Sequence, residues 1–341
     1  MSVLGFDIGG ANLKAAHSAG RCVSRPFAIW KTPDALVAEL RALEGLLPGA
    51  TEIAVTMTAE LADCYETKAE GVAHILAAVQ EVAGPRRVHV WLTSGKFVAP
   101  AEAIAQPLAA AASNWHALAT WATRWTGNHP ALLIDIGSTT TDLIPIDAGR
   151  PASRGLTDAT RMMTGELVYT GVRRTPLCAV APSVPFQNTM CPLAAEWFAT
   201  TLDVWLWLGE IPEDVSDLET ANCRPATRPA AHDRLARQLC CDRLELDALQ
   251  AREIAHYLAD RQMAQISAAL EQVLIDREPR HTVIVSGSGS FLARKIVSQH
   301  PQLRQAHIVD LAAQLSGELA TAACAYAVAQ CRQTAADLSL T

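Results

Sequence analysis

The chain has 341 residues, half of them hydrophobic and 18% charged, with a formal net charge of −7. This composition provides for a large buried core and excludes an intrinsically disordered chain. The acidic balance and the lack of a basic run exclude an electrostatic surface for nucleic acid or for an anionic membrane, so we expect neither partner. At this length, two lobes are favoured over one.

The cysteines and the apolar segments bear on where the protein works. Its nine cysteines are odd in number, scattered and without a C-x-x-C pair, which fits a reducing compartment. Asp7 interrupts the only apolar stretch near the start, and the segment 197–208 contains Asp203 and is too short to cross a bilayer. We therefore expect a cytoplasmic protein that acts on small molecules, and the sequence leaves a homodimer open.

The first third of the chain alternates β-type apolar runs with amphipathic helical runs. Strands are expected at 3–8, 13–17 and 22–29, followed by a helix at 34–46 with Asp34 as its N-cap, a strand at 52–58, a helix at 70–82 and a strand at 88–92. This alternation is typical of α/β architecture.

The rest of the chain repeats this beginning. A mostly helical segment at 99–126 precedes a second strand-loop-strand start at 131–136 and 143–146, which indicates an internal duplication. Helices at 194–208, 230–241 and 247–274, a strand at 282–286, a helix at 291–299, a strand at 307–309 and a closing helix at 311–331 follow. We expect an N-terminal lobe at 1–128 and a C-terminal lobe at 129–341, with the last helix packing back on the first lobe.

Two glycine loops at corresponding points of the two starts carry the strongest chemical signal. The first contains Asp7, Gly9, Gly10 and Asn12, and the second contains Asp135, Gly137, Ser138, Thr139, Thr140 and Asp142. Glycine lets backbone N–H groups approach an anion, hydroxyls add donors, and aspartate can hold Mg²⁺ through water. The pair predicts two jaws around a phosphorylated ligand, with Asp7, Asp135 and Asp142 near Mg²⁺.

Two further features fit a phosphate site. Gly287, Ser288 and Gly289 follow a buried-looking strand and open a helix, where N–H groups and the helix dipole favour an anion or hold a nucleotide. Lys14 lies one strand beyond the first loop and could pair with a phosphate oxygen, although a surface lysine needs no such explanation.

Polar clusters follow two of the expected strands. Ligands of α/β sheets usually bind at the carboxyl ends of strands, which favours a role for Glu60, Asp63, Glu66 and Lys68, but a solvated helix start would look alike. The second cluster contains Asp158, Arg161, Glu166, Tyr169, Arg173 and Arg174. Guanidinium groups match phosphate oxygens, and an exposed turn explains the two adjacent arginines equally well.

In this order, the three glycine loops resemble the phosphate 1, phosphate 2 and adenosine motifs of the actin, Hsp70 and sugar kinase superfamily. That resemblance implies two ribonuclease-H-like α/β lobes with a ligand cleft between them. Narrower strings, including E-L-A-D-C at 60–64, N-W at 114–115 and G-E-L-V-Y-T-G at 165–171, resemble the hydantoinase/oxoprolinase-like family. The likeness covers nearly the whole chain and favours the branch linked to tetrahydromethanopterin-dependent C1 transfer.

The resemblance implies an alkyl transferase of methanofuran-type cofactor biosynthesis. A furanylmethyl diphosphate would condense with the phenol of a γ-glutamyltyramine-like amine, forming an ether and releasing diphosphate. Asp7 and Asp135 would position Mg²⁺, the loops and Lys14 would bind diphosphate, and Glu60, Asp63 or Glu166 could act as the base near the phenol. The residues expected to bind substrate are Glu66, Lys68, Asn114, Trp115, Asp158, Arg161, Tyr169 and Arg173.

Two other functions remain open from the sequence. One is an ATP-dependent kinase or amidohydrolase of the same fold, so ATP stays a candidate cofactor beside Mg²⁺. The other is a nucleotide-gated regulatory ATPase. The loop 220–225 has Asn222 and Cys223 where the family pattern has an acid and a glycine, which puts a ligand role of that loop in doubt.

Overall fold

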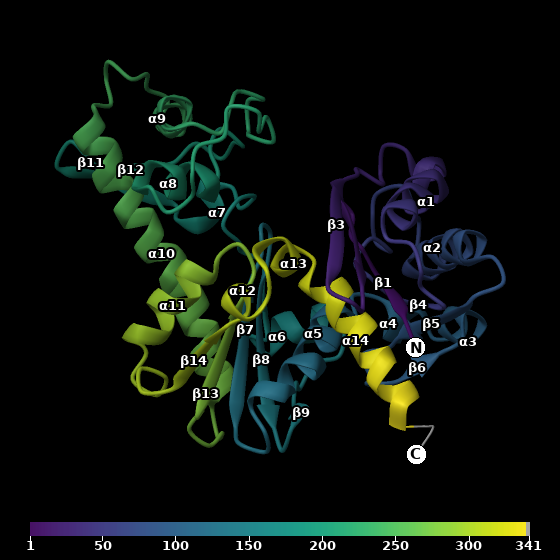
Figure 1. Ribbon diagram of the computed structural model, residues 1–341. Coiled ribbons are helices and arrows are strands. Elements are labelled where there is room, and N and C mark those ends of the chain that lie inside the picture. The colour runs from purple at the N-terminus through teal and green to yellow at the C-terminus, as the bar shows by residue number, and fades with distance from the viewer. Residues whose placement is uncertain (339–341) are drawn as a thin grey trace.

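The computed structural model describes residues 1–338 of the chain. Two mixed β-sheets lie side by side, each covered by helices, and a long C-terminal helix runs between them (Figure 1). The fold is therefore α/β, as the alternation of strands and helices predicts.

The N-terminal sheet has the strand order β3-β2-β1-β4-β5-β6. Its first three strands pair antiparallel, and β4 and β5 continue from β1 in parallel, which is the ribonuclease-H-like arrangement. All residues of β1 and β4 are buried, because helices cover both faces of the sheet. The strands are β1 (Val3–Ile8), β2 (Asn12–His17), β3 (Arg21–Pro26), β4 (Glu52–Met57), β5 (Arg87–Trp91) and β6 (Phe97–Val98).

The second sheet repeats this order as β10-β8-β7-β13-β14, with β9 paired to β8. Here β7 and β8 pair antiparallel, whereas β13 and β14 continue from β7 in parallel. The strands are β7 (Ala131–Ile136), β8 (Thr141–Asp147), β9 (Arg150–Pro151), β10 (Leu167–Val168), β13 (Thr282–Ser286) and β14 (His307–Asp310).

Helices fill the connections and the faces of the sheets. In the first half they are α1 (Leu36–Leu46), α2 (Lys68–Ala83), α3 (Pro100–Ala105), α4 (Pro107–Ala110), α5 (Asn114–Ala122) and α6 (Asp158–Met163). An outcrop of the second lobe, at the upper left of Figure 1, contains α7 (Leu177–Val180), β11 (Ser183–Phe186), β12 (Thr189–Pro192), α8 (Thr201–Leu208) and α9 (Arg228–Arg237). The remaining helices are α10 (Ala248–Leu274), α11 (Ser290–Gln299), α12 (Leu311–Gln314), α13 (Gly317–Thr321) and α14 (Ala323–Leu338).

Two helices connect the lobes. α14 packs on β1, β2 and β4 of the first sheet and also on α5, whose side chains join the core of the second sheet. Gly5 permits this packing, since a Cβ there would lie 2.0 Å from the carbonyl oxygen of Ala325. The C-terminal helix therefore belongs structurally to both lobes.

Several sequence-based boundaries differ from the structure, and three of them have a clear local reason. The single helix expected at 311–331 is three helices, because the backbone is extended at Leu315 and Ser316 and leaves the helical conformation again at Ala322. The helix expected at 194–208 begins only at Thr201, where Thr200 and Asp203 form a capping box. Asp34 caps nothing and lies within a short 3₁₀ turn at Pro33–Ala35 that precedes α1.

Candidate functional site

The two glycine loops have the same backbone geometry. In the β1–β2 hairpin, Asp7 pairs with Lys14, and the Gly9 N–H donates a 3.0 Å hydrogen bond to the Asn12 carbonyl. In the β7–β8 hairpin, Asp135 pairs with Asp142, and the Gly137 N–H donates a 2.9 Å bond to the Thr140 carbonyl. Each loop is thus a tight turn that sets an aspartate beside a charged residue of the next strand.

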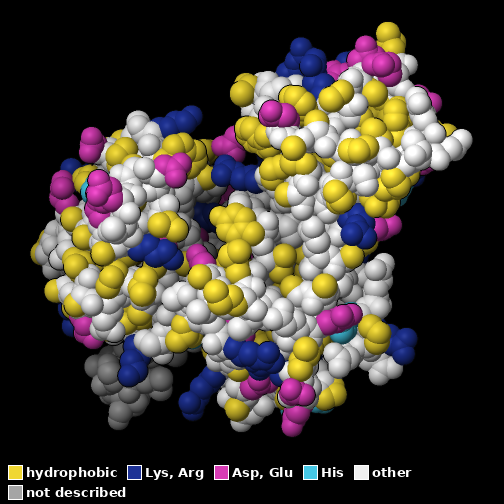
Figure 2. Space-filling model, turned by 180° about the vertical axis from the view of Figure 1, so that it is seen from behind, with side chains coloured by type: hydrophobic (Ala, Val, Ile, Leu, Met, Phe, Trp, Pro, Cys, Tyr) yellow, Lys and Arg dark blue, Asp and Glu magenta, His cyan; other side chains and the backbone are white. Residues whose placement is uncertain are grey.

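Both hairpin tips border one cavity of about 400 Å³ between the lobes. Figure 2 shows the molecule hollowed between its two lobes, with Lys or Arg side chains at the edge of the notch. From the first lobe the cavity is bordered by Asp7, Gly9, Gly10, Asn12, Lys14 and Trp30; from the second by Asp135, Gly137, Ser138, Thr139, Thr140 and Asp142; and from the segments nearby by Asn114, Trp115, Asp158, Arg161, Tyr169 and Arg174.

Opposite charges meet at the base of this cavity. Burial raises the pKa of Asp7, although the charge of Lys14 opposes the shift. Burial and the neighbouring Asp142 raise the pKa of Asp135 to about 6. Burial disfavours the charge on Lys14, but Asp7, Cys324 and Asp135 together outweigh it and raise the pKa of the ammonium group. Lys14 is therefore a cation close to both aspartates.

The donor set fits a magnesium ion that is held by few protein ligands. Asp7 is only 5% exposed, and its Oδ1 atom has no hydrogen-bond partner among the described residues. Carboxylate oxygens suit Mg²⁺, which usually keeps several waters and binds through one or two carboxylates plus phosphate oxygens. Within residues 1–338, no group of three or more His, Cys, Asp or Glu side chains is arranged to hold a metal, so the protein alone would not complete the coordination shell.

The segment 165–171 holds the second loop in position. A Cβ at Gly171 would lie 2.5 Å from the Thr139 nitrogen, so only glycine allows this close approach. The next N–H groups bond back to the loop, from Val172 to the Gly137 carbonyl and from Arg173 to the Ser138 carbonyl, each at 3.0 Å. The G-E-L-V-Y-T-G string is thus the support of the second hairpin tip.

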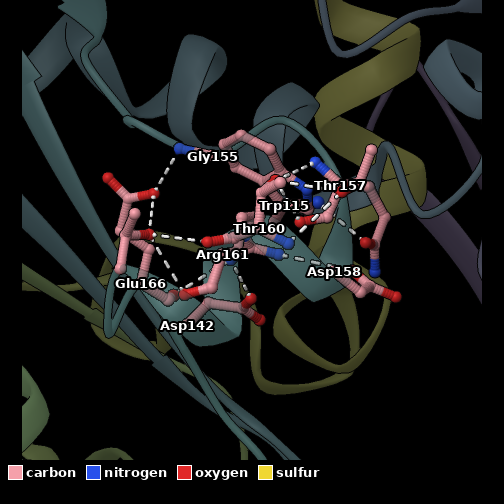
Figure 3. Close-up of polar contacts among 10 residues, drawn as sticks. Trp115, Asp142, Gly155, Thr157, Asp158, Thr160, Arg161 and Glu166 are labelled. Atoms are coloured by element: carbon pink, nitrogen blue, oxygen red, sulfur yellow. Dashed lines mark hydrogen bonds and ion pairs between the residues drawn. The ribbon is translucent and has the colours of Figure 1, made fainter.

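Arg161 links the second hairpin to the α5 helix (Figure 3). Its guanidinium group is 1% exposed and stacks on the Trp115 ring, 4.1 Å from the centroid. It donates a 2.5 Å hydrogen bond to Asp142 Oδ1 and lies 3.8 Å from Asp158 Oδ1. Arg161 therefore supplies the positive charge that the second hairpin lacks in its own strands.

Glu166 is a structural residue in this arrangement. Its carboxylate accepts hydrogen bonds from the N–H groups of Arg154 and Gly155 and from the Thr164 hydroxyl, at 2.5, 2.8 and 2.9 Å (Figure 3). It is not among the residues that border the cavity. The geometry does not bring it to a position where it could act as a base.

The polar cluster that follows β4 also lies away from the cavity wall. Glu60 is 2% exposed, its Oε2 atom has no hydrogen-bond partner in the described chain, and burial raises its pKa to about 7. Asp63, Glu66 and Lys68 do not border the cavity either. The Thr67 hydroxyl caps α2, so part of this cluster is the helix start that the sequence left as the alternative.

The third glycine loop and Arg173 support the site without bordering it. A Cβ at Gly287 would lie 2.6 Å from Asp135 Oδ1, and the Gly289 N–H donates a hydrogen bond to the Ile136 carbonyl. The loop formed by Gly287, Ser288 and Gly289 therefore packs against the second hairpin and does not border the cavity. Arg173 forms an ion pair with Asp217. The adjacent Arg174 borders the cavity and has only a loose pair with Glu219 at 3.6 Å.

Trp30 is a cavity residue that the sequence reasoning missed. It follows the edge strand β3, and the Ile29 N–H holds this segment to the Gly10 carbonyl at 3.1 Å. The only available signal was a tryptophan in a turn.

The loop 220–225 is held by its own backbone and by Arg234. Asn222 accepts hydrogen bonds from the Arg224 N–H and the Arg234 guanidinium. Cys223 has φ of 54°, a conformation that glycine adopts without strain.

Comparison with known proteins decides the family. The model of the hydantoinase/oxoprolinase family matches residues 52–334. The chain belongs to this family. It is 31% identical over 98% of both chains to (4-{4-[2-(gamma-L-glutamylamino)ethyl]phenoxymethyl}furan-2-yl)methanamine synthase of Methanocaldococcus jannaschii. The enzyme of the same name from Methanococcus vannielii is 29% identical over 58% of this chain and 88% of its own. Both relatives are synthases, which supports a biosynthetic enzyme.

Solved structures agree on the fold. The nucleotide-free structure of acetone carboxylase superposes with a TM-score of 0.50, at 12% identity, over 87% of this chain and 49% of its own. At this identity the likeness shows the fold alone. The repeated strand order of the two sheets agrees with the two ribonuclease-H-like lobes expected from the sequence. Within residues 1–338, no helix is both long and apolar enough to cross a membrane.

Proposed function

We propose that this enzyme joins a furanylmethyl diphosphate to the phenol of a γ-glutamyltyramine-like amine, in methanofuran-type cofactor biosynthesis. The phenol oxygen forms a bond to the furanylmethyl carbon as the bond from that carbon to diphosphate breaks. The product named for the relatives contains such a phenoxymethyl-furan ether. Two observations together support this proposal most strongly. The chain is similar to the Methanocaldococcus jannaschii synthase over nearly its full length. Its cavity between the lobes is bordered by two Asp-x-Gly turns, a lysine and two arginines.

The diphosphate end of the substrate matches the hairpin tips. Gly10, at which a Cβ would meet nothing within 4 Å, leaves the backbone open to an anion, and Ser138 and Thr139 add hydroxyl donors. Lys14, which lies close to Asp7 and Asp135, would provide a positive charge for the leaving group. A magnesium ion held by Asp7 and Asp135 would neutralise further charge on the departing diphosphate.

The phenolic end matches the outer part of the cavity. Trp30 from the first lobe and Tyr169 from the second border it, and both rings are exposed, at 38% and 65%. Asp158 also borders the cavity, and burial raises its pKa despite the nearby Arg161. Asp158 is thus better located than Glu60, Asp63 or Glu166 to accept the phenol proton.

The test is to incubate the full chain with Mg²⁺, the aminomethyl-furanylmethyl diphosphate and γ-glutamyltyramine, and to measure product mass together with released pyrophosphate. We expect ether and pyrophosphate in equal amounts without added ATP. Tyramine and tyrosine as alternative acceptors measure the need for the γ-glutamyl group. If product formed only with ATP, with release of ADP or phosphate, the enzyme would instead catalyse an ATP-dependent reaction.

A further inference from the structure

A second and larger cavity lies on the chain away from the hairpin tips. Its volume is about 730 Å³, within the range of small-molecule sites, and it shares no lining residue with the cleft between the lobes. It lies between β5 and β6, the end of α5 and the far part of α14. We call it the distal cavity.

The walls of the distal cavity are aromatic. Trp91 and Phe97 pack edge to face, with ring centroids 4.7 Å apart. Trp121 lies on the α5 side and packs in the same way against Tyr326 at 5.5 Å. Trp91 and Trp121 are 4% and 3% exposed, so these rings are fixed by their surroundings. Rigid aromatic walls of this kind suit a flat apolar group.

The charges at its rim have one sign. Among the residues whose side chains the structure describes, Lys96, Arg124 and Arg332 border the distal cavity, and no aspartate or glutamate does. Arg332 pairs with Glu52, but Arg87 also pairs with this acid, so one carboxylate serves two arginines. Among the described residues, Lys96 and Arg124 have no carboxylate partner. On a chain of net charge −7, this cluster of cations indicates an anionic ligand.

The remaining polar groups leave the cationic rim uncompensated. Burial raises the pKa of the Cys331 thiol to about 12, so this group stays neutral at ordinary pH. The Arg124 guanidinium lies over the Trp121 ring, 4.7 Å from its centroid, and its Nε atom donates to the Trp121 carbonyl. This stacking holds the cation at the edge of the aromatic wall, where it can face a carboxylate on a ring bound inside.

Two helices border both cavities. The first residues of α5, Asn114 and Trp115, border the cleft, whereas Trp121 near its end borders the distal cavity. Likewise Cys324 at the start of α14 borders the cleft, and Cys331 and Arg332 border the distal cavity. A molecule bound in the distal cavity would therefore contact the same elements that border the cleft, without competing for the cleft itself.

We propose that the distal cavity is a second ligand site, for a small aromatic carboxylate whose ring lies among Trp91, Phe97 and Trp121 and whose anionic group faces Lys96 and Arg124. This assignment is independent of the reaction proposed for the cleft. The expected occupant is a small molecule, because the cavity is concave and its rim is cationic.

The test uses 1-naphthoate and the uncharged 1-naphthalenemethanol as probes of the full chain, by calorimetry. We expect one naphthoate per chain, bound about tenfold more tightly than the alcohol. The Lys96→Gln/Arg124→Gln double variant should lose this preference, while Arg124→Lys should retain it. Arg304→Gln, which changes an exposed arginine elsewhere, is the matched control. Thermal unfolding verifies that each variant is folded.

The following results would overturn the proposal. They are equal affinity for the two probes, an unchanged preference in the double variant, competitive displacement of naphthoate by magnesium pyrophosphate, and binding that appears only after removal of residues 339–341, which lie outside the described part. A chain that is dimeric, binds no naphthoate, and becomes monomeric in the double variant would assign the cavity to a second copy.

Discussion

The β1–β2 and β7–β8 hairpins have the same turn but different electrostatics. In the first, the residue paired with the aspartate is Lys14, so the hairpin carries its own counter-charge. In the second, the corresponding residue is Asp142, and the positive charge comes from Arg161 on α6. The same backbone turn thus occurs once with balanced charges and once with an excess of carboxylates, which suits a ligand that combines phosphate oxygens with a metal ion.

The largest expected effect comes from removing the aspartate carboxylate that each hairpin has at the corresponding position. Asp7→Asn and Asp135→Asn should each lower kcat by about 10³-fold, because each removes a carboxylate from the magnesium and diphosphate region. Pyrophosphate release measures the effect, with Asp34→Asn as the exposed control. If only one of the two variants lost activity, the hairpins would not act together.

The counter-charge of the second hairpin should matter for stability. Arg161→Gln leaves Asp142 without its partner and removes the stacking on Trp115, so the free energy of unfolding should fall by about 3 kcal/mol. Urea unfolding of this variant and of Arg161→Gln/Asp142→Asn provides the measurement. The double variant should recover part of the loss, and an equal loss in both would contradict the pairing.

The strands that run parallel to β1 and β7 end differently, and this difference should appear in the pH dependence of stability. The glycines 287 and 289 follow β13, but the buried Glu60 follows β4. The folded-state pKa of Glu60, about 7, lies above its usual 4.5, so the stabilising protonation is complete below pH 4.5 and is lost as the pH rises through 7. This loss amounts to at most about 3 kcal/mol.

Glu60→Gln should therefore be more stable than the parent at pH 8, and should have no such advantage at pH 4.5. Denaturant midpoints at both pH values are the measurement, and Glu66→Gln, at an exposed position, is the control. Parallel stability profiles for Glu60→Gln and the parent protein would show that Glu60 is not titrating in this range.

The counter-charge of the first hairpin should act mainly on binding. Lys14→Met should raise KM for the diphosphate substrate by about tenfold, because a cation next to the leaving group is lost. Lys14→Arg retains the charge and should restore part of the affinity. A Lys14→Met variant with unchanged KM and lowered stability would restrict Lys14 to neutralising Asp7 in the fold.

The smallest effect is expected at Gly10, whose counterpart in the second hairpin is Ser138. A Cβ at Gly10 meets nothing within 4 Å, so Gly10→Ala should leave the stability within about 1 kcal/mol of the parent value. A rise of a few-fold in KM would come from the ligand alone. Destabilisation of several kcal/mol would mean that the loop is packed more tightly than described.

The sequence predicted what depends on local pattern and missed what depends on distant packing. The strand at 282–286 and the two hairpins follow from apolar runs bounded by glycine, and the structure has them. The closing helix at 311–331 was wrong, because the extended backbone at Leu315 and Ser316 interrupts a helical pattern. Trp30 could not be assigned, since its approach to the first loop depends on a bond from Ile29 to Gly10.

Among the expected site residues, those next to the glycine turns lie together for a simple reason. Register fixes Lys14 opposite Asp7 and Asp142 opposite Asp135, and both pairs can be read from hairpin spacing. The structural roles of Glu166 and Arg173 could not be predicted from the sequence, because their partners come from other segments. These partners are the Arg154–Gly155 backbone for Glu166 and Asp217 for Arg173. A polar residue in a motif can bind ligand or support the loop that does, and only its partners distinguish the two.

The proposed reaction requires the two hairpins to hold one diphosphate together. Calorimetric titration of methylenediphosphonate with Mg²⁺ into the full chain tests it most directly. We expect one site per chain, with binding abolished by Asp7→Asn and equally by Asp135→Asn, while both variants remain folded. Retention of full affinity in either variant would contradict it.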